Sequence, residues 1–210
     1  SLLQDAGRRH VQHLGVSPSG PVDLHAAAWA NCLLDNRWGT PLLEVALGGL
    51  SLRCLGDTWV AVCGAQVSIS LDGAPRSNWS CFAVRTGQLL QLGHACSGQR
   101  AYLAVAGGFQ ARRQLGSVAT QQRDGIGGLH GDGSALRAGD LLHCGRAAQL
   151  KARSVPAQFQ PDYRLPSNLR LIVGGDAMNF TEHEFNGFFA QSWHVSPHSD
   201  RMGCRLYGAP

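Results

Sequence analysis

The sequence predicts a mainly β protein: an antiparallel barrel or sandwich with short helices, followed by a second, shorter β unit. From Leu42 to Cys144, short apolar and β-branched runs are separated by glycine-containing breaks, which is typical of closely spaced strands and not of repeated βαβ units. From Arg146 to Asn168 the chain is polar and contains three prolines, which indicates a linker. We therefore expect a first domain over 1–145, a linker over 146–168 and a second unit over 169–210.

A helix is predicted over Asp23–Asn36, near the start of the chain. Asp23 is a residue type that caps helix N-termini, and the segment after it is rich in alanine and leucine with few β-branched residues. Its apolar residues recur at helical spacing. We therefore expect one face of this helix to be buried.

After the helix, eight short runs have the length and composition of strands. They are Leu42–Leu47, Leu50–Leu55, Trp59–Cys63, Val67–Leu71, Phe82–Arg85, Leu89–Leu92, Ala101–Val105 and Asp140–Cys144. Asp72-Gly73 and Ala106-Gly107-Gly108 supply the residues that turns or bulges need. Ser77–Trp79 and the glycine-rich segment Asp124–Gly133 are predicted to be loops.

The second unit is expected to begin with a strand over Leu169–Val173. Thr181 and Glu184 have the spacing of a capping box, which predicts a helix over Phe185–Gln191 with its phenylalanines facing a core. Strands are predicted over Trp193–Val195 and Cys204–Tyr207. Three strands and one helix cannot close a barrel, so this unit is expected to be incomplete or to pack on the first one.

Composition and charge exclude several classes of protein. The formal net charge of +4 is spread over scattered arginines without interleaved aromatics, so no nucleic-acid surface is predicted. Apolar runs are too short to span a membrane, so no membrane association is predicted. The seven cysteines form no CxxC pair and most lie in apolar runs, so we expect small buried thiols in a reducing compartment, the cytoplasm.

Most motifs of nucleotide, metal or nucleophile chemistry are absent. The chain has one lysine, Lys151, so no lysine-containing phosphate-binding loop is possible. The Gly125–Gly133 cluster lacks the full dinucleotide-binding spacing and is better interpreted as a loop. His10 and His13 have no third ligand at suitable spacing, so no metal site is predicted. The serines near residue 17 lack the spacing of a nucleophile elbow.

Two segments resemble each other and carry the candidate site. Val16–Asp23 and Val195–Gly203 both run from Val-Ser-Pro into serine, a carboxylate and glycine. Proline fixes the backbone there, glycine permits close approach, and arginine offers a planar cation suited to a carboxylate or carboxamide. The candidate residues are Ser19, Gly20, Asp23, His198 and Ser199 for ligand binding, and Asp200 and Arg201 for catalysis. The alternative is that Asp23 only caps its helix and that Asp200 and Arg201 only fix a turn.

At these motifs the sequence resembles the KipA-like, or allophanate hydrolase subunit two-like, family. That family includes the C subunit of bacterial 5-oxoprolinase and a carboxyltransferase segment of urea amidolyase. The matching stretches, in family order, are Leu3–Arg8, Gly15–Asp23, Leu43–Gly49, Leu71–Gly73, Arg100–Gly108, Leu115–Ser117, Leu136–Asp140 and Ser196–Leu206. Val22 and Cys204 stand where members usually carry methionine and tyrosine.

The resemblance implies a fold of two cyclophilin-like β-barrel units, and the two Ser-Pro loops would be counterparts in them. Members of the family continue through further strands beyond the position of Pro210. We therefore expect the C-terminal part of the second barrel to be missing from residues 169–210. The resemblance also implies a KipI-like B subunit as partner, with a ligand pocket near the junction.

The resemblance implies three alternative functions. As the C subunit of an ATP-dependent 5-oxoprolinase, the chain would act with the A and B subunits to hydrolyse 5-oxoproline to L-glutamate, with ATP handled elsewhere in the complex. As a biotin-dependent carboxyltransferase component, it would act on urea or allophanate. As a non-catalytic module, it would antagonise a KipI-like kinase inhibitor. The first two require recognition of a small cyclic amide or ureido ligand, and a stand-alone chain favours the first.

Overall fold

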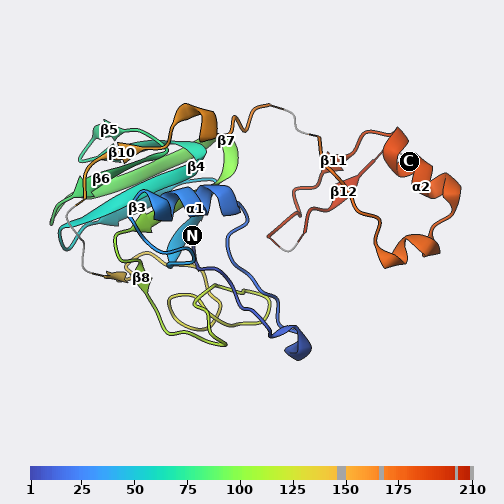
Figure 1. The fold of residues 1–210 in the computed structure, drawn as a ribbon, viewed down its shortest axis with the longest axis horizontal. Helices are drawn as coiled ribbons and strands as arrows, with labels where there is room; N and C mark the ends of the chain where they lie inside the picture. The colour runs from blue at the N-terminus through green and yellow to red at the C-terminus, as the bar shows by residue number, and fades with distance from the viewer. Residues whose placement is uncertain (146–149, 166–167, 202, 209–210) are drawn as a thin grey trace. The chain divides into compact units, whose positions relative to one another are not determined.

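The computed structural model describes residues 1–145, 150–165, 168–201 and 203–208. The chain divides into two compact units, Ser1–Leu165 and Pro166–Pro210 (Figure 1). The first unit is an antiparallel β structure with one α-helix. The second is much smaller and has its own helix and strands.

The first unit is built on an eight-stranded antiparallel sheet. Its strands are β1 (Leu2–Gln4), β2 (Leu42–Ala46), β3 (Leu50–Arg53), β4 (Thr58–Leu71), β5 (Ala74–Arg76), β6 (Ser80–Val84), β7 (Leu89–Val105) and β10 (Arg153–Ser154). The order is β1-β2-β7-β4-β6-β10, with β3 on β7 and β5 on β4. The mainly β prediction is confirmed. The barrel is not closed, because the described pairings leave β1 and β10, strands of three and two residues, at opposite ends of the path.

Two pairs of predicted strands are in fact single long strands. The runs predicted on either side of Gly64 form the 14-residue β4, and those on either side of Gly98 form the 17-residue β7. The ladder passes Gly64 with register shifts between Gly64 and Ile69. Gly64 has a φ of 98°, and a Cβ there would lie 2.5 Å from the carbonyl oxygen of Arg100. Glycine therefore marks a bulge with close backbone approach at this position, not the end of a strand.

Helix α1 (Leu24–Cys32) covers one face of this sheet (Figure 1). The helix presents the small side chains of Ala26, Ala27 and Ala30 to the sheet. Along β4, Ala61 and Cys63 contribute to the cluster under the helix, whereas Val60 and Val62 belong to a second apolar cluster. This alternation follows from the two-residue period of a strand and means that both faces of β4 are buried.

Part of the predicted linker belongs to the first unit. Strand β10 pairs with β6 at Arg153↔Cys81 and Ser154↔Ser80, and the N–H of the buried Val155 donates to the carbonyl of Trp79 at 2.8 Å. The 3₁₀ helix η2 (Ala157–Phe159) follows. Without β10, the edge of β6 would expose unpaired backbone N–H and C=O groups. Arg153 and Ser154 pair with these groups although the composition of their segment is typical of a loop. Residues 146–149 lie outside the described part of the chain.

The short strands β8 (Phe109–Gln110) and β9 (His143–Cys144) form a separate ladder. Of the strand predicted over Asp140–Cys144, only the last two residues, His143 and Cys144, form a strand. The segment Asp124–Gly133 is a loop, as predicted, and it contains isolated β-bridges.

All seven cysteines are free, but Cys32, Cys96, Cys144 and Cys204 are exposed, so the prediction that most are buried is wrong.

The second unit contains η3 (Gly175–Asn179), α2 (Glu182–Ala190), β11 (His194–Val195) and β12 (Leu206–Tyr207). The predicted capping box of Thr181 and Glu184 is present. The strand predicted over Leu169–Val173 is wrong: Ile172 is 97% exposed, and the described strands of this unit pair only with each other.

The phenylalanines of α2 do not face a buried core. Phe188 and Phe189 are 38% and 58% exposed, and α2 has no buried residue. Their rings pack on each other, and Phe188 also packs on Trp193. Within the described part of the chain, no helix combines the length and apolar character that crossing a bilayer would require.

Candidate functional site

Asp23, the acidic residue of the first Ser-Pro loop, makes two separate contacts with its carboxylate. Oδ1 accepts a hydrogen bond from the N–H of Ala26 at 2.9 Å and so caps α1. Oδ2 accepts a hydrogen bond from the hydroxyl of Tyr163 at 2.6 Å. The predicted capping role is confirmed. Asp23 and Tyr163 are both only partly buried, so this pair can also meet a ligand from solution.

Beneath Asp23 lies a buried polar pair, Tyr102 and Glu44. The hydroxyl of Tyr102 donates to Oε2 of Glu44 at 2.9 Å and accepts from the N–H of Asp23 at 2.8 Å. The same Oε2 accepts from the N–H of Val22 at 3.0 Å, and Arg100 lies 3.6 Å from Oε1. Glu44 is therefore buried together with compensating donors, as a buried carboxylate requires.

Burial changes the ionisation of both tyrosines. Burial first, and then the negative charge of Glu44, raise the pKa of Tyr102 well above its ordinary value. The pKa of Tyr163 is raised by burial and by its hydrogen bond to Asp23. Both phenols therefore stay protonated near neutral pH and act as hydrogen-bond donors to carboxylates.

The other candidate residues of this loop, Ser19 and Gly20, lie in the left-handed region, with φ of 58° and 94°. The N–H of the buried Gly20 donates to Oε1 of Gln4 at 3.1 Å, and Nε2 of Gln4 donates to the carbonyl of Thr120 at 3.2 Å. The loop is thus held through its main-chain N–H groups at Gly20, Val22 and Asp23. Its side chains take no part in these three contacts.

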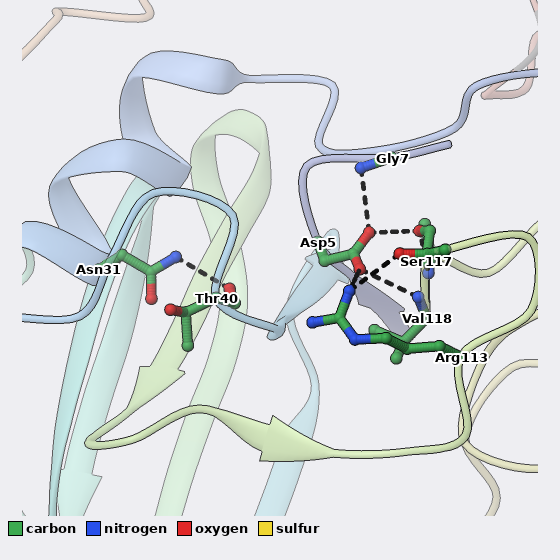
Figure 2. A network of polar contacts seen from close by, with 9 residues as sticks. Asp5, Gly7, Asn31, Thr40, Arg113, Ser117 and Val118 are labelled. Carbon is green, nitrogen blue, oxygen red and sulfur yellow. Dashed lines mark hydrogen bonds and ion pairs between the residues drawn. The ribbon is translucent and has the colours of Figure 1, made fainter. Parts of the chain in front are cut away.

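The turn after β1 lies against the Ser-Pro loop at Pro18. Asp5 organises this turn (Figure 2). The Asp5 carboxylate accepts hydrogen bonds from the N–H of Gly7 and the N–H of Val118, each at 3.0 Å, and from the hydroxyl of Ser117. Nη1 of Arg113 lies 3.6 Å from Oδ2. A Cβ at Gly7 would lie 2.6 Å from the carbonyl oxygen of Pro18, so only glycine fits between the two segments.

Arg8 continues this turn and is almost completely buried, with 1% of its surface exposed. Its backbone N–H donates a hydrogen bond to the carbonyl of Pro18 at 2.7 Å. None of its three guanidinium nitrogens has a hydrogen-bond partner among the described residues. Burial lowers the pKa of this guanidinium, and the charges of Asp5 and Asp124 oppose that shift.

The second Ser-Pro loop joins β11 and β12 and is closed by its own hydrogen bonds. The N–H of Ser199 donates to the carbonyl of Ser196 at 3.0 Å, and the N–H of Arg205 donates to Oγ of Ser199 at 3.0 Å. Oδ1 of Asp200 accepts from the N–H of Gly203 at 3.2 Å, which is a turn contact. His198 and Asp200 are exposed, and Ser199 and Arg201 are partly exposed.

The predicted site residues therefore fall into two groups. Ser19, Gly20 and Asp23 belong to the first unit, and His198–Arg201 to the second. Sequence reasoning missed the four residues that support or extend the first group: Gln4, Glu44, Tyr102 and Tyr163. Glu44 could have been found from the sequence, because it is the one charged residue in the apolar run Leu42–Val45. No sequence pattern near Tyr163 indicates its role, because its partner Asp23 lies 140 residues away.

The glycine-rich loop does not fit a nucleotide phosphate. The N–H groups of Gly127, Gly128 and Gly133 donate to Gln114, Val118 and Gly127, so they are already used within the protein. A phosphate-binding loop needs such groups pointing at the ligand. Across the described residues, no group of three or more His, Cys, Asp or Glu side chains is placed to hold a metal ion.

Comparison with known proteins identifies the family. Residues 14–210 match the family described as carboxyltransferase domain, subdomain A and B. The chain is 35% identical to the C subunit of 5-oxoprolinase from Escherichia coli K12 over 99% of this chain and 66% of that protein. It is 30% identical to urea amidolyase of Saccharomyces cerevisiae over 99% of this chain and 12% of that protein. The chain thus spans slightly less than two thirds of the bacterial relative.

The crystal structure of Kluyveromyces lactis urea carboxylase has the same fold. It superposes with a TM-score of 0.86 at 29% identity, over 99% of this chain and 20% of that one. The resemblance seen in the sequence motifs is confirmed by these matches. The chain belongs to the carboxyltransferase-domain family, in the part that comprises subdomains A and B.

Proposed function

We propose that this chain acts as the C subunit of an ATP-dependent 5-oxoprolinase, working with a KipI-like B subunit and an A subunit to hydrolyse 5-oxoproline to L-glutamate. The observation that carries the proposal is the extent of similarity. Two relatives named as the C subunit of 5-oxoprolinase match 99% of this chain and 66% and 65% of their own length. The urea amidolyase match covers 12% of a much larger protein.

The chemistry of the first loop supports this proposal. Asp23 offers carboxylate lone pairs that can accept a ligand N–H, and the Tyr163 hydroxyl, which donates to Asp23, lies beside it; both residues are partly exposed. A lactam presents one N–H donor and one carbonyl acceptor in a plane, so the pair would orient it if Asp23 accepts the N–H and the Tyr163 hydroxyl turns from Asp23 to the carbonyl when the ligand binds. Tyr102 and Glu44 hold the loop rigidly behind them, which is what preorganised binding requires.

ATP is proposed to bind on the other components of the complex. The glycine-rich loop of this chain uses its N–H groups internally, and Lys151 follows no glycine-rich phosphate motif. The hydrolase chemistry is therefore proposed to require the assembled complex, with Asp200 and Arg201 as the candidate catalytic residues of this chain and His198 and Ser199 beside them.

A biotin-dependent carboxyltransferase is the second candidate function, favoured by the family match and by the two fungal urea amidolyase and carboxylase relatives. Biotin would have to be supplied by another chain, because Lys151 lies between Leu150 and Ala152 and not between methionines. Asp23 and Tyr163 would face a ureido group in this case, since it is also a planar donor and acceptor.

The test is reconstitution of the full-length chain with its A and B partners. Release of glutamate from 5-oxoproline that depends on ATP is the expected result. A complex that assembles but releases no glutamate, and instead carboxylates urea when a biotinylated partner is added, would establish the second function. Asp200→Ala is expected to abolish turnover with assembly intact, whereas Asp176→Ala, in the same unit, is the matched control. Unchanged turnover in Asp200→Ala would remove its catalytic assignment.

A further inference from the structure

A small pocket of about 370 Å³ opens on the first unit, apart from the Asp23–Tyr163 pair. Three loops form it: the turn after β1, the loop after α1 at Trp38 and Gly39, and the loop after β8 from Arg113 to Gly116. Its size is at the lower end of the range for small-molecule sites.

Two arginines give the pocket its charge. Arg9 is exposed and makes no hydrogen bond or ion pair within the described residues. Arg113 is 59% exposed, and both of its contacts use Nη1: one to Asp5 and one to the carbonyl of Gly116 at 2.9 Å. Figure 2 shows its other terminal nitrogen turned away from Asp5. The pocket therefore keeps guanidinium donors that the protein does not use.

Asp5 does not cancel this positive charge at the pocket surface. Only 3% of its side chain is exposed, and its oxygens accept hydrogen bonds from Gly7, Ser117 and Val118. The carboxylate is thus satisfied from within and positions Arg113. Guanidinium groups recognise carboxylates through paired, charge-assisted hydrogen bonds.

Trp38 supplies the apolar wall of the pocket and is 50% exposed. An exposed tryptophan next to arginines is a combination found in binding sites, because the indole provides a flat contact surface for a ring or a short chain. The pocket thus combines a cationic side with a flat apolar side, which suits a small organic acid.

We propose that this pocket binds a small molecule through a carboxylate group, with Arg9 and Arg113 holding the carboxylate and Trp38 contacting the remainder. The inference rests on the pocket geometry and does not require the proposed function. If that function holds, both 5-oxoproline and L-glutamate carry the group that the pocket recognises. Urea has no carboxylate and should not bind here.

The test is calorimetric titration of the purified full-length chain with three probes: 5-oxoproline, L-glutamate and 2-pyrrolidinone, which is the same lactam without the carboxylate. At least one of the two acids should bind, and 2-pyrrolidinone should bind roughly 10- to 100-fold more weakly than 5-oxoproline or not at all. Comparing the two acids distinguishes a substrate site from a product site. Because the proposed lactam contact at Asp23 and Tyr163 could also take up 2-pyrrolidinone, the comparison is repeated in Asp23→Ala. Binding of neither acid, or equal binding of 5-oxoproline and 2-pyrrolidinone in that variant, overturns the proposal.

Variants then assign the residues. Arg9→Gln should weaken acid binding by roughly 10-fold or more without changing the fold, because Arg9 is exposed and makes no hydrogen bond or ion pair within the described residues. Arg113→Gln should do the same, and Arg113→Lys, which keeps the charge, should restore part of the affinity. Arg112→Gln is the matched control, because this neighbouring exposed arginine does not line the pocket. Unchanged affinity in Arg9→Gln and Arg113→Gln also overturns the proposal, whatever the reconstituted complex does with 5-oxoproline.

Discussion

The hydroxyl of Tyr163 donates a 2.6 Å hydrogen bond to Asp23, although 140 residues separate the two in the sequence. The same Asp23 carboxylate caps α1 through Ala26. One side chain therefore connects the start of the helix with the segment of the first unit that follows β10.

Removal of the Asp23 carboxylate should destabilise the first unit. Asp23→Ala loses the helix cap, worth roughly 1–2 kcal/mol, and the Tyr163 contact, worth about 1 kcal/mol. Asp23→Asn keeps a good capping group and should lose less than about 1 kcal/mol. Urea unfolding followed by tryptophan fluorescence measures both, with Tyr163→Phe isolating the second contact. Equal losses in Asp23→Ala and Asp23→Asn would contradict the capping role.

Tyr102→Phe should be costly although it removes a single oxygen. The variant leaves the N–H of Asp23 without its acceptor and takes one donor from the buried Glu44. Loss of such contacts at a buried site costs roughly 1–3 kcal/mol in free energy of unfolding. Tyr207→Phe, at an exposed position, should change it by less than about 0.5 kcal/mol. A Tyr102→Phe variant as stable as the parent would refute the contact.

Stability should fall in alkaline solution. The raised pKa of Tyr102 means that the folded state keeps a proton that the unfolded state releases above pH 10. This contribution is therefore fully present below about pH 10 and is lost as the pH rises beyond it, at up to about 1.4 kcal/mol per pH unit. Tyr163 and Cys63, whose pKa values burial also raises, add to the decline.

The Tyr102 share of this decline can be separated from the shares of Tyr163 and Cys63. Free energies of unfolding measured from pH 9 to pH 11 should decrease less steeply in Tyr102→Phe than in the parent chain, because phenylalanine has no proton to release. Identical slopes in the two proteins would mean that Tyr102 ionises normally.

Gly127→Ala should be far more damaging than Gly73→Ala. Both glycines have positive φ, 73° and 80°, so alanine is strained at either position, by about 1 kcal/mol. A Cβ at Gly127 would also collide with the carbonyl oxygen of Ala119 and with Nη2 of Arg8, whereas a Cβ at Gly73 meets nothing within 4 Å. We expect a loss above about 3 kcal/mol for the former. Similar unfolding midpoints for the two variants would contradict the close packing around Arg8.

Local signals predicted local structure well. The capping residue and alanine-rich run predicted α1, and the Thr181–Glu184 spacing predicted the start of α2. These features depend on neighbours in the sequence. The strand predicted over Leu169–Val173 failed because β-branched composition does not supply a partner strand.

Long-range relationships could not be predicted from the sequence. Nothing near Arg153 indicates that it pairs with Cys81, and nothing near Gln4 indicates that it holds Gly20. The glycines inside β4 and β7 predicted breaks between separate strands, because a glycine in a bulge and a glycine that ends a strand look alike in sequence. Such features are determined by which segments meet, not by the segments themselves.

The path of the first Ser-Pro loop does not depend on most of its side chains. The loop is held by hydrogen bonds from its main-chain N–H groups to Gln4, Glu44 and Tyr102. Every residue except proline has such an N–H group. A position such as Val22 can therefore be exchanged while the loop keeps its path, whereas the positive φ of Ser19 and Gly20 restricts the residues that fit there. During divergence of the family, new ligand preferences could thus arise here by single substitutions, without rebuilding the scaffold that presents them.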